Sequence, residues 1–392
     1  MTSEPHTSLP GINAEEILQD IRAWVEIETP TTDGAAVNRL VDLVEAGVRH
    51  LGMQVERLPG RDGYGDILTA RSPWGGDGAG ILVLAHLDTV HPIGTLAQHN
   101  PWRRDGDRVY GPGTFDMKSG ICIAMRAFRH LTESGVETPL PITFLFIPDE
   151  EIGSPTSRGV IEHAARRNTY VLVPEPAHGG RCCTARNGVA LFDIHVTGRP
   201  AHAGSRHQDG RSANLELARH VVELEAMTDY DRGITVNVGL IAGGSFINVV
   251  PATATAKFCV RAPETETLDA LVAEISARRS FDPDVKLDIR GEINRPVFER
   301  SPGTVRLYEH TRAICRRIGF DLVERHSGGG SDGNFTAALG VPTLDGLGAD
   351  GHGHHTHDEY FLLSSLEPRV AMWVELFSSL TRSKGNHPCN AS

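Results

Sequence analysis

The sequence predicts an α/β protein in which helices flank a mostly parallel sheet and a smaller α+β domain is inserted. Three short apolar runs are typical of buried strands: 81–85, 143–147 and 170–173. Apolar residues with helical periodicity alternate with these runs, at 15–27, 35–52, 118–135 and 304–320. Continuous apolar strands that alternate with helices indicate a parallel sheet covered on both faces.

The middle of the chain has a different order of elements. The expected strands are 188–198, 234–242, 254–262 and 285–293, and the expected helices are 212–227 and 267–279. Strand, helix, two strands, helix and strand in this order form the ferredoxin-like unit. We therefore expect residues 185–296 to form an inserted domain, and residues 1–184 and 297–392 to form the outer domain.

The composition excludes several classes of function. A chain of 392 residues with 40% hydrophobic residues suits two or three folded domains. A net charge of −12 argues against nucleic acid and against a basic surface that docks on a membrane. The N-terminal stretch has no apolar signal-peptide core, and no apolar run is long enough to span a bilayer, so we expect a cytoplasmic location. The six irregularly spaced cysteines then indicate reduced thiols.

Potential metal ligands follow each short apolar strand. In chain order they are His86 and Asp88, then Asp149, Glu150 and Glu151, and then Glu175. Asp116 precedes the helix at 118–135, and the segment 351–360 carries four histidines. Because ligands bind beyond the carboxyl ends of parallel strands, we expect these side chains to meet in one crevice.

Each of these features has a simpler interpretation by itself. A glutamate pair after a strand is usually a solvated turn, Asp116 suits a helix N-cap, and a histidine-rich loop is often only polar. Their combination favours a metal site, because histidine and carboxylate ligands together suit zinc. A dication would also neutralise carboxylates that otherwise repel one another.

Five ordered motifs resemble the M20 family of di-zinc metallopeptidases and deacylases, and within it the glutamate carboxypeptidase type. They are HLDTV at 86–90, GPGTFDMKSG at 111–120, DEE at 149–151, PEP at 174–176 and GRPAHAG at 198–204. The resemblance covers about residues 80–360. It implies a zinc exopeptidase-like outer domain and an inserted lid that forms a homodimer interface.

The resemblance also implies a role for each candidate residue. His86, Asp116 and Glu175 would hold one zinc ion, and Asp116, Glu151 and His355 the other, with Co²⁺ or Mn²⁺ as possible substitutes. His355 is chosen among four histidines because the family ligand precedes a glutamate by four residues, here Glu359; His357 is the alternative. Asp88 would orient His86, and Glu150 would be the general base. A cis peptide is expected between Asp116 and Met117.

The inserted domain supplies the expected substrate contacts. His202 resembles a histidine that reaches into the partner subunit's site and stabilises the oxyanion, and a polar loop residue is its simpler interpretation. Asn248 and Arg295 match substrate-contacting positions, although Arg295 also suits a salt bridge. Arg181 is a looser match to a carboxylate contact. Gly330 ends a glycine run at 328–330 that allows close backbone approach to a ligand or only a flexible turn.

The leading hypothesis is a zinc-dependent hydrolase that releases a C-terminal amino acid from a peptide. A glutamate at position 175 favours substrates with a free carboxylate, since the family's aminopeptidases more often have aspartate there. The first alternative is an N-acyl-amino-acid deacylase, of the acetylornithine or succinyl-diaminopimelate type. The second is a ligand-binding protein that has lost catalysis, although Glu150 and all five ligand positions are occupied.

Overall fold

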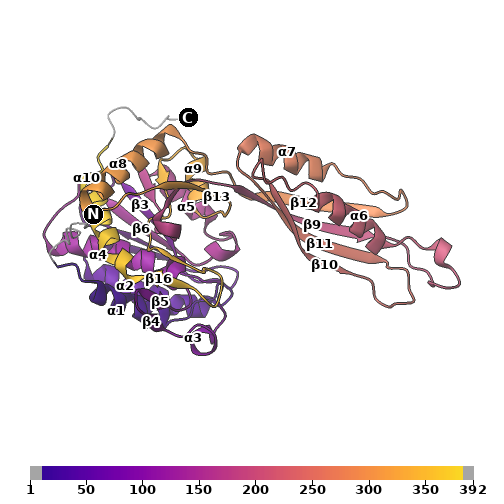
Figure 1. The fold of residues 1–392 in the computed structure, drawn as a ribbon, viewed down its shortest axis with the longest axis horizontal. Helices are drawn as coiled ribbons and strands as arrows, with labels where there is room; N and C mark the ends of the chain where they lie inside the picture. The colour runs from indigo at the N-terminus through magenta and orange to yellow at the C-terminus, as the bar shows by residue number, and fades with distance from the viewer. Residues whose placement is uncertain (1–10, 383–392) are drawn as a thin grey trace. The chain divides into compact units, whose positions relative to one another are not determined.

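The computed structural model describes residues 11–382 and divides the chain into two compact units (Figure 1). Among the described residues, the first unit comprises 11–184, Arg300–Arg325 and 335–382. The second comprises Ala185–Glu299 and His326–Asn334. Their expected roles as catalytic domain and lid stay predictions. Cys389 and the first ten residues, which bear on the thiol and signal-peptide expectations, lie outside the described residues.

A six-stranded mixed sheet forms the centre of the first unit. Its order is β1-β2-β6-β3-β7-β14, and β6, β3, β7 and β14 are mutually parallel. The strands are β1 Gln54–Leu58, β2 Ile67–Arg71, β3 Ile81–His86, β6 Ile142–Ile147, β7 Tyr170–Leu172 and β14 Thr343–Leu344. Every residue of β3 and β6 is buried, as expected for strands covered on both faces. The α/β fold class predicted from the sequence is confirmed.

Three helices of the first unit, α1, α2 and α8, begin next to a residue whose side chain caps them. The helices are α1 Ala14–Val25, α2 Gly34–His50, α3 Thr95–Gln98, α4 Ser119–Glu133, α5 Arg158–Arg166, α8 Pro302–Ile318 and α10 Leu366–Ser379, while α9 Gly333–Ala338 begins with two residues of the second unit. Ser301 Oγ accepts a hydrogen bond from Thr304 N at 3.1 Å, and Pro302 occupies the first turn of α8. Gly319 ends that helix with φ +113°. The helix α10 packs against α4 and α8.

Two smaller sheets complete the scaffold. One has the order β15-β16-β5-β4, and the other pairs β13 with β8. Their strands are β4 Arg103–Asp105, β5 Arg108–Tyr110, β8 Cys182–Arg186, β13 Glu324–Ser327, β15 Gly351–His352 and β16 Tyr360–Leu362. Pairing of β16 with β5 places the histidine-rich segment beside the chain that leads to Asp116.

The second unit is a four-stranded antiparallel sheet with the order β10-β11-β9-β12, and both of its helices pack on that sheet. Its elements are β9 Gly188–Thr197, α6 Ala213–Glu225, β10 Thr235–Gly243, β11 Thr253–Ala262, α7 Thr265–Ser276 and β12 Lys286–Arg295. Along β9, buried residues alternate with more exposed ones, so the sheet buries one face under the helices. This is the strand and helix order expected from the sequence.

The segment His326–Asn334 belongs to the second unit, although the sequence suggested the outer domain. His326 Nε2 lies 2.6 Å from Asn187 Oδ1, and Arg295 Nη1 donates to Asp332 Oδ1 at 2.6 Å. Asn334 Nδ2 donates to the carbonyls of Asn187 and Pro296. These long-range bonds hold the glycine-rich loop against β12.

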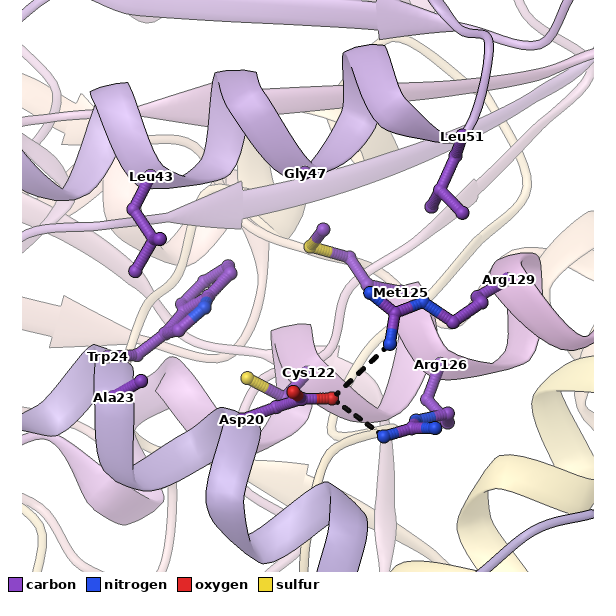
Figure 2. A pocket seen from close by; sticks show the side chains of 10 residues that line it. All are labelled: Asp20, Ala23, Trp24, Leu43, Gly47, Leu51, Cys122, Met125, Arg126 and Arg129. Carbon is purple, nitrogen blue, oxygen red and sulfur yellow. Dashed lines mark hydrogen bonds and ion pairs between the residues drawn. The ribbon is translucent and has the colours of Figure 1, made fainter.

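Helices α1, α2 and α4 surround a hollow of about 170 Å³ on the first unit (Figure 2). Trp24 and Met125 contribute apolar surface, and Asp20 forms ion pairs with Arg126 and Arg129 at 2.8 and 3.9 Å. The hollow contains none of the candidate site residues.

Residues 11–382 contain no membrane-spanning helix and no paired cysteine. Within that range, no helix is both long enough and apolar enough to cross a membrane. The five cysteines it contains are free, and four of them are buried. The cytoplasmic location stays a prediction.

Candidate active site

The candidate ligands meet because β6, β3 and β7 are parallel neighbours. His86 is the last residue of β3 and pairs with Ile147, the last residue of β6. The carboxylates that follow β6 therefore emerge beside His86, and Glu175 follows β7 on the other side of β3. The sheet register thus brings together residues that are about 90 positions apart in the sequence.

Asp116 lies between two histidines. Its Oδ1 is 3.1 Å from His86 Nε2, and its Oδ2 is 3.2 Å from His355 Nε2. The peptide bond between Asp116 and Met117 is cis, as the resemblance implied. Since each carboxylate oxygen faces a different imidazole, Asp116 has the geometry of a ligand shared by two positions.

Glu151 and Glu175 each lie beside one of these two histidines. Glu151 Oε2 is 3.0 Å from His355 Nε2, and Glu175 Oε1 is 3.6 Å from His86 Nε2. Four of the five side chains are buried, and the fifth, His355, is 48% exposed. The five residues therefore lie in one cluster, and their division into two ligand sets stays a prediction.

Burial and neighbouring charges shift the pKa values of the cluster in opposite directions. Burial alone would raise the pKa of Asp116, but hydrogen bonds with His355 and His86 outweigh burial and lower it. Hydrogen bonds with Asp116 and Glu151 raise the pKa of His355 to about 11. Burial, followed by the negative charge of Asp116, raises the pKa of Glu151 and of Glu175.

A divalent metal ion fits this set of donors. His86, Asp116 and Glu151 each offer a ligand atom, and these atoms lie within 4.8 Å of one another. Glu151 Oε1 is buried and has no hydrogen-bond partner among the residues that the structure describes. Leaving such an oxygen without a partner is costly, and a cation would satisfy it. Imidazole nitrogens with carboxylate oxygens are ligand types that zinc accepts.

The three consecutive carboxylates after β6 have different environments. Asp149 is fully buried, and its Oδ2 accepts hydrogen bonds from Thr156 N at 2.7 Å and Thr156 Oγ1 at 2.6 Å. It fixes the turn, a role that the sequence did not indicate. Glu150 and Glu151 begin a short 3₁₀ helix, so their side chains leave the backbone in different directions.

Asp88 supports both His86 and the glutamate pair. Its backbone carbonyl lies 2.9 Å from His86 Nδ1, closer than its carboxylate, which lies 3.5 Å away. The carboxylate accepts hydrogen bonds from Glu150 N and Glu151 N, both at 3.2 Å, and from Thr31 Oγ1 at 2.7 Å. Asp88 therefore orients His86 mainly through its backbone, while its side chain anchors the segment that follows β6.

Of the four histidines in 351–360, His355 contacts the cluster. It is held at φ +62°, in a tight loop closed by the bond from Thr356 N to Gly353 O at 3.0 Å. The ring of His357, the alternative ligand, stacks on His99 with centroids 4.6 Å apart. His354 packs edge-on against His178, and His352 lies in β15.

The expected substrate contacts of the second unit form two groups. His202 and Asn248 are both exposed and lie side by side, since Ala203 N donates to Asn248 O at 3.0 Å. Arg295 is buried at the end of β12, and a Cβ added to Gly330 would lie 2.7 Å from its Cδ. Arg181 is exposed and directly precedes β8 in the first unit.

Comparison with known proteins decides the family. The chain matches the model of peptidase family M20/M25/M40 over residues 82–379. The chain belongs to this family. It is 30% identical over 375 residues to carboxypeptidase G2 of Pseudomonas sp. (strain RS-16), covering 94% of this chain and 90% of that protein.

Solved structures show the same fold at low sequence identity. A tripeptidase from Staphylococcus aureus has a TM-score of 0.76 and 20% identity, with coverage of 94% of this chain and 98% of that one. An M20 metallo-carboxypeptidase from Sulfolobus solfataricus has a TM-score of 0.71 and 15% identity, with coverage of 93% and 98%.

The family assignment fixes the general chemistry of this M20 peptidase. It is a metallopeptidase-type hydrolase of peptide or amide bonds, and its family uses divalent metal. The resemblance stated from the motifs is confirmed. The alternative of a ligand-binding protein without catalysis is not supported.

Glu151→Gln should weaken metal binding by more than about tenfold, because it replaces a carboxylate expected to bind the metal directly. Even residues that only hydrogen-bond to a metal ligand contribute about 10- to 100-fold to metal affinity. Elemental analysis after dialysis against a graded series of free zinc concentrations would measure the loss. Glu16→Gln, in α1 and outside the cluster, is a surface control for the loss of one carboxylate, since its side chain is 56% exposed. Equal metal content in Glu151→Gln and wild type would remove Glu151 from the ligand set.

Proposed function

We propose that this M20 peptidase is a zinc-dependent exopeptidase of the glutamate carboxypeptidase type, which releases a C-terminal amino acid. The observation that carries the proposal is the convergence of His86, Glu151, Glu175 and His355 on Asp116. Similarity to carboxypeptidase G2 supports the choice of a carboxypeptidase over an aminopeptidase. Deacylation of N-acyl amino acids, the alternative, would use the same residues, so substrate tests decide between them.

The five clustered residues would hold two zinc ions, with Asp116 shared between them. When bound, such ions supply a Lewis acid that polarises the scissile carbonyl and makes water acidic near neutral pH. The second zinc is part of the proposal, as is the choice of zinc over cobalt or manganese.

Glu150 is proposed as the general base. Asp88 holds its backbone at the end of β6, next to the ligand Glu151. The Glu150 carboxylate would accept a proton from the attacking water and return it to the leaving nitrogen, because the two transfers occur in sequence.

His202 is suited to stabilise the oxyanion. Its Nδ1 accepts hydrogen bonds from Gly204 N at 3.1 Å and Ser205 N at 3.2 Å. In a neutral imidazole the proton must then be on Nε2, which becomes a donor. A donor aimed at the developing negative charge lowers the barrier of acyl transfer.

The two groups of substrate contacts lie at opposite ends of one sheet. Arg295 pairs with Val189 at the start of β9, whereas Thr197 at its other end pairs with Thr253. Eight residues of strand span about 26 Å, and His202 bridges Val249 beyond that far end. An extended dipeptide covers only about 7 Å. One copy of the second unit therefore cannot present both His202 and Arg295 to one small substrate.

A homodimer would solve this problem by supplying His202 from the partner. The edge strand β10 pairs only with β11 in the described sheet, so its other edge is open (Figure 1). Exposed apolar side chains accompany this edge: Leu240 and Ile241 on β10, Phe246 in the following loop, and Leu215 and Val222 on α6. An open strand edge with exposed apolar residues suits pairing with a second copy.

A hydrolysis screen tests the function directly. Peptides and N-acyl amino acids with a free C-terminal carboxylate should release the amino acid, and activity should disappear with chelator and return with zinc. Glu150→Gln should keep its metal but lose at least about a hundredfold in turnover. Full activity in verified metal-free enzyme would contradict the proposal, and a preference for N-acyl over peptidyl substrates would favour the deacylase.

Arg295→Ala should penalise substrates with a free carboxylate. Loss of a charge-assisted hydrogen bond costs about 1.5–3 kcal/mol, or roughly a 10- to 150-fold drop in kcat/KM. The amide or methyl ester of the same substrate should lose much less. Equal losses on acid and ester would mean that Arg295 does not bind the substrate carboxylate.

Mixing two inactive proteins tests the exchange of His202 between subunits. Heterodimers of His202→Ala and Glu150→Gln should regain part of the activity, since one of their two sites has both groups intact. Subunit exchange would be verified by mass spectrometry of the intact dimer. Heterodimers that stay inactive would show that His202 does not act across the interface.

A further inference from the structure

Glu359 has an unusually complete set of hydrogen-bond donors for a buried carboxylate. The residue is fully buried. Its Oε1 accepts from Phe115 N and Asp116 N, both at 2.9 Å. Its Oε2 accepts from Gly113 N at 2.9 Å and lies 2.8 Å from His91 Nε2. Four donors match the acceptor capacity of an ionised carboxylate.

These contacts connect three segments that each carry a candidate ligand. His91 lies five residues after His86, Asp116 is itself one of the bonded residues, and Glu359 follows His355 by four residues. The backbone carbonyl of Glu359 adds two contacts, from Gly111 N at 3.4 Å and Asn100 Nδ2 at 3.2 Å. Glu359 thus joins the strand end of β3, the turn before α4 and the histidine-rich loop.

The turn that carries Asp116 depends on an acceptor for its backbone N–H groups. Its backbone leaves helical geometry at Asp116, with φ −115° and ψ 95°, and Gly113 has φ +68°. Backbone N–H groups in such a turn need acceptors that no regular helix supplies. The carboxylate of Glu359 supplies them for three of the turn's residues.

We propose that Glu359 is a positioning residue of the metal centre: it fixes the Asp116 turn against the loop of His355, so that the shared carboxylate meets both histidines. The inference rests on the proposed metal-dependent function. It assigns Glu359 no contact with substrate or metal. Outer partners of metal ligands typically contribute about 10- to 100-fold to metal affinity, and Glu359 acts on two ligand segments at once.

The second unit offers a matched control. Glu216 is also buried, accepts hydrogen bonds from Phe281 N at 2.6 Å and Asp282 N at 3.2 Å, and lies 3.3 Å from His220 Nε2. It therefore has the same chemistry, backbone N–H groups and a histidine, without a candidate ligand among its partners. Glu359→Gln and Glu216→Gln remove the same charge from similar environments.

Metal affinity and the visible spectrum of the cobalt-loaded protein distinguish a residue that positions the metal centre from one that only stabilises the fold. Competition with a chromophoric chelator should show about 10- to 100-fold weaker zinc binding in Glu359→Gln, with altered cobalt absorption bands. Glu216→Gln should lower the unfolding temperature of the metal-free protein but leave zinc affinity and the cobalt spectrum unchanged. If Glu359→Gln does not fold, His91→Ala replaces it, because three backbone donors still hold Glu359; a smaller loss of affinity is then expected.

The outcomes distinguish this inference from the proposed function. Wild-type protein that binds no zinc or cobalt would contradict the metal-dependent function, and the inference with it. If the wild-type protein binds zinc and Glu359→Gln, or His91→Ala in its place, binds zinc with the same affinity, only the inference about Glu359 is overturned. Equal losses of affinity in Glu359→Gln and Glu216→Gln would also overturn it, because the effect would then follow from general destabilisation.

Discussion

The attraction between the buried carboxylate of Asp116 and positive charge on both of its sides is the interaction on which the rest of the site depends. Asp116 is surrounded by Glu151 and Glu175, and burial raises the pKa of both of these neighbours. Such a group of carboxylates is stable only when protons or a cation neutralise it. The two histidines and the unsatisfied Glu151 Oε1 supply the remaining ligands for metal.

The scaffold holds these ligands through bonds that reach across the sequence. Parallel pairing of β3, β6 and β7 sets where His86, Glu151 and Glu175 emerge. Asp88 holds the backbone of the glutamate pair, Asp149 closes the turn behind it, and Glu359 holds the Asp116 turn. Each of these anchors is a buried carboxylate that accepts backbone N–H groups. Some acidic residues of the site are therefore candidate ligands, and others hold the backbone of those candidates.

Much of the fold, and the meeting of the candidate ligands in one cluster, could be predicted from sequence for identifiable reasons. The runs at 81–85 and 143–147 are continuously apolar because both faces of β3 and β6 are covered, which makes these strands easy to recognise. The four helices expected in the outer domain correspond to α1, α2, α4 and α8, and the observed ends differ from the expected ends by only a few residues. The strands β1 and β2 were missed: β1 alternates partly buried with exposed side chains and contains three charged or polar residues. The helix α5 was also missed, since it has only two buried residues.

The supporting contacts could not be predicted, because they join distant residues without a local pattern. Glu359 meets Asp116 across 243 positions, and the bond between His91 and Glu359 spans 268. The pairing of Arg295 with Asp332 likewise depends on how the glycine-rich loop packs on β12. Sequence motifs suggested the candidate ligands through family resemblance, whereas the residues that hold these candidates in place required coordinates.

Anomalous X-ray scattering from crystals grown with zinc tests the central claim most directly. Data collected on either side of the zinc absorption edge should show two peaks flanking Asp116, each about 2.0–2.2 Å from nitrogen or oxygen ligands. One peak should be bounded by His86 and Glu175, and the other by Glu151 and His355. Crystals without an anomalous peak at Asp116, or with zinc bound only elsewhere, would contradict the claim that a metal dication neutralises this carboxylate cluster.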